Sequence, residues 1–79
     1  MTDEELMRLA LAEADMAFAL GEVPVGAVVA KDGQPIALAH NTRETEKNAL
    51  HHAELLAIDA ACKKLGGWRL WQCELFVTL

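Results

Sequence analysis

The sequence predicts an α/β fold whose elements follow the order helix, strand, strand, helix, strand. Apolar residues recur at helical spacing in two segments, residues 6–18 and 55–65. Three shorter apolar runs, residues 23–30, 35–39 and 74–79, are bounded by turn-forming residues, as strands are. The chain has 79 residues, of which 53% are hydrophobic, so we expect one domain, or part of one, around an apolar core.

The first helix has a start signal and a stop signal. Thr2 and Glu5 have the spacing of a capping box, in which each residue satisfies a backbone N–H of the other. Gly21 can end the helix in the left-handed conformation.

Two strands joined by a tight turn should follow. Residues 23–30 are predicted to form a strand that is buried on both faces beyond Pro24. Asp32-Gly33 is a strong hairpin signal, and residues 35–39 return as the second strand.

The second helix is predicted to begin after a polar loop, residues 40–47. Asn48 can cap it, and it should run to about Leu65, before Gly66-Gly67. Because few of its positions are polar, we expect a buried helix. Residues 68–71 then connect to the third strand, and we expect Trp68 and Trp71 to pack between helix and strand rather than to serve as platforms for stacked bases.

The charge of the chain argues against a nucleic-acid-binding surface in this piece. The net charge is −5 and the seven Lys and Arg residues are scattered, whereas phosphate backbones require a basic patch. Lys63, Lys64 and Arg69 form the one local cluster, which is typical of a solvated helix end.

The chain also lacks the signals of export. No apolar run approaches the roughly 20 residues of a membrane span, and the acidic first residues differ from a signal peptide. We therefore expect a cytoplasmic location and no membrane partner. Cys62 and Cys73 fit reduced thiols better than a disulfide framework.

His52-Ala53-Glu54 carries the chemistry that the sequence suggests. An imidazole that can hold a metal and a carboxylate that can move protons are what a hydrolytic zinc site needs. A catalytic zinc takes three protein ligands, of which His52 is one. Taken alone, His52 could be an ordinary helix histidine, Glu54 an exposed carboxylate and Asn41 a turn residue.

Five segments in sequence order resemble the zinc-dependent nucleoside and tRNA adenosine deaminases. They are residues 21–29, 40–44, 52–55, 65–70 and 75–79, which together span nearly the whole chain. The bacterial tRNA adenosine deaminases look closest, because residues 22–27 (Glu-Val-Pro-Val-Gly-Ala) and 68–70 (Trp-Arg-Leu) occur together.

The resemblance implies a cytidine-deaminase-like three-layer fold, of which residues 1–79 would be the N-terminal part. In that family His52 would be a zinc ligand, Glu54 the proton shuttle and Asn41 a contact to the base or ribose. The family's other two ligands belong to a Pro-Cys-x-x-Cys motif expected directly after Leu79, which Cys62 and Cys73 do not replace. Residues 48–51, Asn-Ala-Leu-His, also depart from the Asp-Pro-Thr-Ala of many relatives.

The implied function is hydrolytic deamination of adenosine to inosine at the wobble position of tRNA, with Zn²⁺ as cofactor. The implied partners are the anticodon loop of tRNA and a second subunit in a homodimer. Two alternatives remain open: a deaminase of a free nucleobase, nucleoside or nucleotide such as guanine, cytosine or dCMP, and a truncated or split chain without activity of its own.

Overall fold

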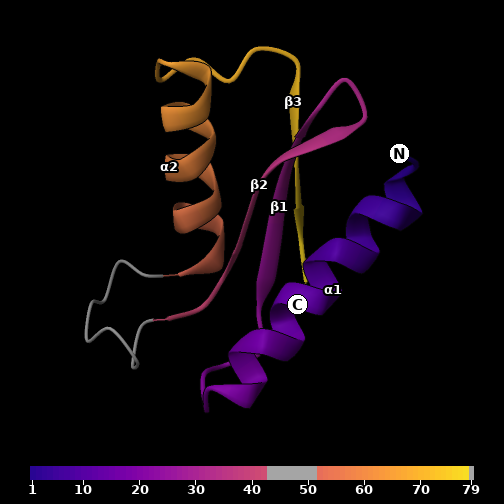
Figure 1. Ribbon diagram of the computed structural model, residues 1–79, viewed down its shortest axis with the longest axis vertical. Helices are drawn as coiled ribbons and strands as arrows, with labels where there is room; N and C mark the ends of the chain where they lie inside the picture. Colours follow the sequence, from indigo (N-terminus) through magenta and orange to yellow (C-terminus); the bar gives the residue numbers. More distant parts are fainter. Residues whose placement is uncertain (43–51, 79) are drawn as a thin grey trace.

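The computed structural model describes residues 1–42 and 52–78 and contains the predicted elements in the predicted order. They are α1 (Asp3–Ala19), β1 (Gly26–Lys31), β2 (Gln34–His40), α2 (Ala53–Leu65) and β3 (Cys73–Val77). The strands form one sheet in the order β2-β1-β3, with β1 antiparallel to both neighbours. Helix α1 covers one face of the sheet and α2 the other, so the three-layer α/β/α prediction is confirmed (Figure 1).

Helix α1 begins with the predicted capping box. The Thr2 hydroxyl accepts a hydrogen bond from the Glu5 N–H at 3.1 Å, and the Glu5 carboxylate accepts one from the Thr2 N–H at 2.9 Å. The backbone hydrogen bond from Thr2, followed by the one to its side chain, lowers the pKa of the Glu5 carboxyl below its usual value. The helix ends at Ala19, and Gly21 follows with a φ of 79°.

Strand β1 is the centre of the sheet, and five of its six residues are buried. Ala27 and Val29 face α2, whereas Val28 and Ala30 face α1. The strand begins at Gly26 and not at residue 23 as predicted. The reason is local: the Val25 N–H donates to the Val23 carbonyl at 2.8 Å, which closes a tight turn around Pro24 before any ladder pairing begins.

The predicted Asp32-Gly33 turn joins β1 to β2. Both residues have positive φ, 53° for Asp32 and 74° for Gly33, as the favoured two-residue hairpin turn requires. A register shift between Val29 and Ala30 marks a bulge in the β1–β2 ladder.

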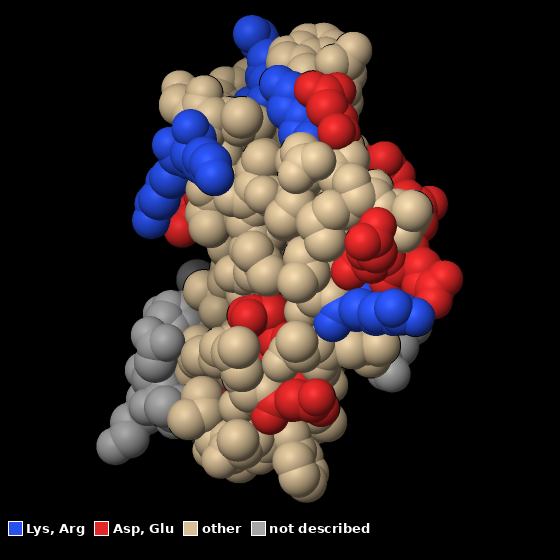
Figure 2. All heavy atoms as spheres, turned by 45° about the vertical axis from the view of Figure 1, so that its right-hand side comes forward, with Lys and Arg blue, Asp and Glu red and all other residues tan. Residues whose placement is uncertain are grey.

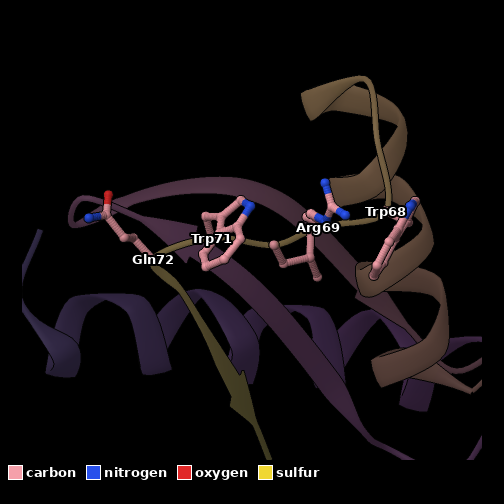
Figure 3. Close-up of a pocket in the computed structure, with 5 residues that line it drawn as sticks. Trp68, Arg69, Trp71 and Gln72 are labelled. Atoms are coloured by element: carbon pink, nitrogen blue, oxygen red, sulfur yellow. The ribbon is translucent and has the colours of Figure 1, made fainter.

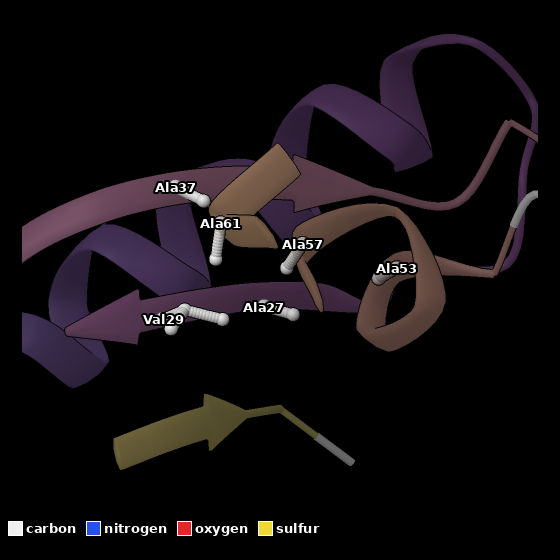
Figure 4. Packing of buried hydrophobic residues seen from close by; sticks show 6 residues of the cluster. All are labelled: Ala27, Val29, Ala37, Ala53, Ala57 and Ala61. Atoms are coloured by element: carbon white, nitrogen blue, oxygen red, sulfur yellow. The ribbon is translucent and has the colours of Figure 1, made fainter. Parts of the chain in front are cut away.

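Helix α2 differs from the prediction in its start and in its burial. It begins at Ala53 with His52 in the N-cap position, and Asn48, the predicted cap, lies outside the described residues. Only one stripe is buried, because the helix meets the sheet on one side. Ala53, Ala57 and Ala61 form that stripe and pack on Ala27, Val29 and Ala37 (Figure 4).

The opposite side of α2 is exposed, which makes the expectation of a buried helix wrong. Leu55 is 48% exposed and Leu65 is 37% exposed. Gly66 ends the helix in the left-handed conformation, as predicted, with a φ of 75°.

Charged side chains are mixed on the surface. On the face in Figure 2, most basic side chains lie toward the top and left and most acidic ones toward the right and bottom, and no continuous basic band forms among the described atoms. Within residues 1–42 and 52–78, neither helix has both the length and the apolarity of a membrane-crossing segment.

Candidate active site at the start of helix α2

The sheet topology gathers the chain at one end of β1. Because β2 and β3 both run antiparallel to β1, their last residues lie beside its first residue. The Asn41 N–H donates to the Val25 carbonyl at 3.2 Å, and the Thr78 N–H donates to the Gly26 carbonyl at 3.0 Å. Asn41 and Thr78 therefore flank the start of β1.

Thr78 holds this end of the sheet with its side chain as well. Its hydroxyl accepts a hydrogen bond from the Gly26 N–H at 2.9 Å in a buried position. The nearby Thr42 hydroxyl is also buried, and it has no hydrogen-bond partner among residues 1–42 and 52–78. Both threonines lie in segments that resemble the deaminase family, residues 40–44 and 75–79, but nothing in the sequence indicated the hydrogen bonding of their side chains.

Asn41 connects this end of the sheet to α2. Its side-chain oxygen accepts a hydrogen bond from the Ala53 N–H at 2.7 Å, and Asn41 is only 7% exposed. The contact brings the end of β2 against the first residue of α2. The three residues singled out in the sequence, Asn41, His52 and Glu54, therefore belong to one small region.

His52 and Glu54 lie side by side on the rim of this region. The His52 Nδ1 is 4.0 Å from the nearer Glu54 carboxylate oxygen, which is too far for a hydrogen bond between them. Their side chains are 43% and 41% exposed, so both can meet a molecule from solvent. An imidazole and a carboxylate at this distance can hold a metal ion and accept a proton, respectively.

The described residues supply only part of a zinc site. No group of three or more His, Cys, Asp or Glu side chains gathers within residues 1–42 and 52–78. Cys62 stands ten residues after His52 along one helix, about 15 Å away at 1.5 Å per residue. Cys73 pairs with Lys31 at the far end of β1. Neither cysteine is in a disulfide, and both lie too far from His52 to share a metal ion with it.

A partly buried hydrogen-bonded pair lies near the same end of the sheet. The His40 Nδ1 is 2.9 Å from the Glu13 carboxylate, with side chains 22% and 13% exposed, so the pair joins β2 to α1. In the sequence, Glu13 is the polar residue among the apolar positions at helical spacing in α1, which indicated that it would need a polar partner.

A hollow of about 440 Å³ lies at the other end of α2, lined by residues 68–72 (Figure 3). The prediction that its tryptophans pack inside is wrong: Trp68 is 77% exposed and Trp71 is 71% exposed. Leu70, between them, packs against the α2-side core instead. The Arg69 guanidinium stacks 4.7 Å from the Trp68 ring centre. The lining residues carry neither carboxylate nor imidazole, in contrast to the start of α2, where His52 and Glu54 lie.

Comparison with known proteins agrees with this fold. The family model described as the cytidine and deoxycytidylate deaminase zinc-binding region matches residues 1–79, and the chain belongs to that family.

Among curated proteins, the chain is similar to tRNA-specific adenosine deaminases. It is 55% identical to that of Bacillus subtilis over 100% of this chain and 50% of the relative. It is 49% identical to that of Aquifex aeolicus over 100% of this chain and 52% of the relative. The chain spans about half the length of the curated relatives it matches.

Two solved structures have the same fold over nearly all of this chain. One comes from work on tRNA:A34 deaminases that edit A to I at the wobble position; it matches with a TM-score of 0.91 and 41% identity, over 95% of this chain and 58% of that one. The other is guanine deaminase from Bacillus subtilis, which matches with a TM-score of 0.91 and 37% identity, over 98% of this chain and 50% of that one.

Proposed function

We propose that the complete protein carrying this chain deaminates adenosine to inosine in tRNA, at the wobble position of the anticodon loop. The observation that supports it most is the meeting of Asn41, His52 and Glu54 at one end of the sheet, made by the hydrogen bond from Ala53 to Asn41. The similarity to tRNA-specific adenosine deaminases, 55% identity over the whole chain in one case, selects the substrate class.

In this proposal His52 is one of three zinc ligands, and the other two come from outside the described residues. Bound zinc would supply an activated water at neutral pH. Glu54 would accept the first proton of the attacking water and deliver it to the purine ring nitrogen, where inosine keeps it. It would then move the second proton, from the hydroxyl added at C6, to the amino group, which leaves as ammonia when its bond to C6 breaks. Asn41 contacts the base or ribose. Water and adenosine are thereby converted to inosine and ammonia, and the carboxylate carries the two protons of the water one after the other.

The proposal includes a homodimer in the cytoplasm. The homodimer is supported by large apolar side chains that the described residues leave exposed, among them Leu55 of α2 and Leu75 of β3, with 48% and 45% exposure. The tRNA surface would then come from the second subunit or from parts of the protein beyond this chain, because the described residues gather no basic band on the face in Figure 2.

A second candidate function is guanine deamination. The observation that favours it is the structural match to the Bacillus subtilis guanine deaminase, whose TM-score of 0.91 equals that of the tRNA deaminase match. The two functions share His52 and Glu54 and differ in what surrounds the base.

A substrate comparison separates them. The complete, zinc-loaded protein is incubated in parallel with an anticodon stem-loop that has adenosine at the wobble position and with free guanine. We expect inosine in the RNA and no xanthine from guanine, both measured by mass spectrometry. Xanthine without inosine would support the second candidate, and neither product would refute the deaminase proposal.

A further inference from the structure

Helix α2 begins without a cap of its own. The N-cap residue is His52, which is extended (φ −82°, ψ 146°) and makes no side-chain hydrogen bond to the helix. Ser, Thr, Asp and Asn are the usual residues there, because their side-chain oxygens accept from the first N–H groups of the helix. A histidine in this position leaves those donors to be satisfied by something else.

Asn41 provides that acceptor from a different element. Its Oδ1 lies 2.7 Å from the Ala53 nitrogen, twelve residues further along the chain. Ala53 is 0% exposed, so water does not reach its N–H in place of Asn41. Leaving a buried N–H without an acceptor costs folding free energy. This single hydrogen bond therefore helps to fix the residue at which the helix begins.

Asn41 itself is fixed to the sheet. Its backbone N–H donates to the Val25 carbonyl, and the residue is 7% exposed. The start of α2 is therefore tied, through one carboxamide, to the end of β1 at which the candidate site lies.

We propose that Asn41 is a positioning residue: it caps α2 from the end of β2 and so sets the pose of His52 and Glu54. The cap from another element releases the His52 imidazole from capping, and a residue at the N-cap can then face a ligand. The roles of His52 and Glu54 rest on the proposed function, whereas the capping by Asn41 does not.

The same hydrogen bond also orients the carboxamide. A backbone N–H can donate only to the oxygen, so the Asn41 Nδ2 is the group that remains to donate to an acceptor on a substrate. Asn41 would thus hold the helix with one end of its amide and the substrate with the other. Aspartate retains the acceptor and loses the donor, and alanine loses both.

The test compares Asn41→Asp with Asn41→Ala in the complete protein. Amide hydrogen exchange at Ala53 is measured by NMR relative to Val29, a buried residue of the central strand. Zinc affinity is measured by competition with a chelator. For Asn41→Ala we expect Ala53 to exchange about five- to tenfold faster relative to Val29 and zinc affinity to fall about tenfold or more.

For Asn41→Asp we expect both quantities to stay within about twofold of the unchanged protein, since the capping oxygen remains. Its kcat/KM on the tRNA stem-loop should nevertheless fall, because the Nδ2 donor is lost. A residue that only binds substrate would lose activity in both variants without changing Ala53 exchange or zinc affinity. That result, or equal loss of protection in the two variants, would overturn the inference.

One further measurement uses the unchanged protein and so does not depend on whether the variants fold. A through-hydrogen-bond NMR coupling between the Ala53 nitrogen and the Asn41 side-chain carbonyl carbon should be detectable, and its absence would refute the capping contact. Failure of the proposed function would show separately, as no turnover of tRNA by the unchanged protein, and would leave the exchange and coupling results unaffected.

Discussion

Replacing Gly26 with alanine should destabilise the fold severely, because α1 lies directly on this residue. A Cβ added at Gly26 would stand 1.9 Å from the Ala10 carbonyl oxygen, 2.6 Å from the Ala14 nitrogen and 2.9 Å from the Glu13 Cβ. The two nearest atoms belong to the backbone of α1, so no side chain can rotate to make room. The helix must move away from the sheet, and its buried contacts with β1 must loosen.

The expected cost is about 3 kcal/mol or more, the upper end of the range for overpacking, since backbone has to shift. A domain of this size has a free energy of unfolding of about 4–12 kcal/mol, so the variant loses a large share of it. The corresponding fall in Tm is about 12–24 °C. Urea unfolding followed by far-UV circular dichroism measures the difference directly.

Two other glycines serve as controls, because they show the effect of replacing glycine by alanine where no steric clash arises. Gly67 has nothing within 4 Å of an added Cβ, and Gly67→Ala should change the free energy of unfolding by less than about 0.5 kcal/mol. Gly66 also has open space but a φ of 75°, so Gly66→Ala measures backbone strain alone, about 1–2 kcal/mol. If Gly26→Ala were no more destabilising than Gly67→Ala, the close approach of α1 to β1 would be wrong.

Five further substitutions test other parts of the structure. Trp68→Ala and Trp71→Ala should each alter the free energy of unfolding by less than about 0.5 kcal/mol, because both rings are exposed; losses of about 3 kcal/mol would show that they are buried. Thr78→Val should cost about 1–3 kcal/mol by leaving a buried backbone N–H of β1 without its acceptor. Thr42→Val, which removes a buried hydroxyl without a partner, should be neutral or stabilising, and equal costs for the two threonines would contradict the assignment. The lowered pKa of Glu5 means that its contribution to stability is complete above its usual value of 4.5 and is lost as the pH falls through the lowered pKa. The free energy of unfolding of Glu5→Gln should therefore depend less on pH in that range. An unchanged dependence would show that the capping box does not contribute to it.

Local chemistry made much of the fold predictable. The capping box of Thr2 and Glu5, the positive-φ turn at Asp32-Gly33 and the left-handed Gly66 each depend on a few neighbouring residues, and each was found where the sequence placed it. Their geometry needs no information from distant parts of the chain, which is why a single sequence is enough to predict them.

What the sequence did not reveal depends on contacts between distant residues. The first N–H of α2 is bound by Asn41, twelve residues earlier in the chain. The exposure of Trp68 and Trp71 follows from Leu70 taking the inward position between them, a choice that hydrophobicity alone does not make. For the candidate site, the sequence indicated Asn41, His52 and Glu54 by resemblance, but not the hydrogen bond that brings Asn41 to the helix.

Zinc content and tRNA deamination in two variants of the complete protein test the central claim most directly. Glu54→Gln should retain zinc, because no zinc ligand is removed. Its rate of deamination should fall by about 10²–10⁴-fold, because the group that carries the protons is lost. His52→Ala should lose both zinc and activity, because a ligand is removed. Near-normal turnover of the anticodon stem-loop by Glu54→Gln, or stoichiometric zinc in His52→Ala, would contradict the roles that the account assigns to these residues.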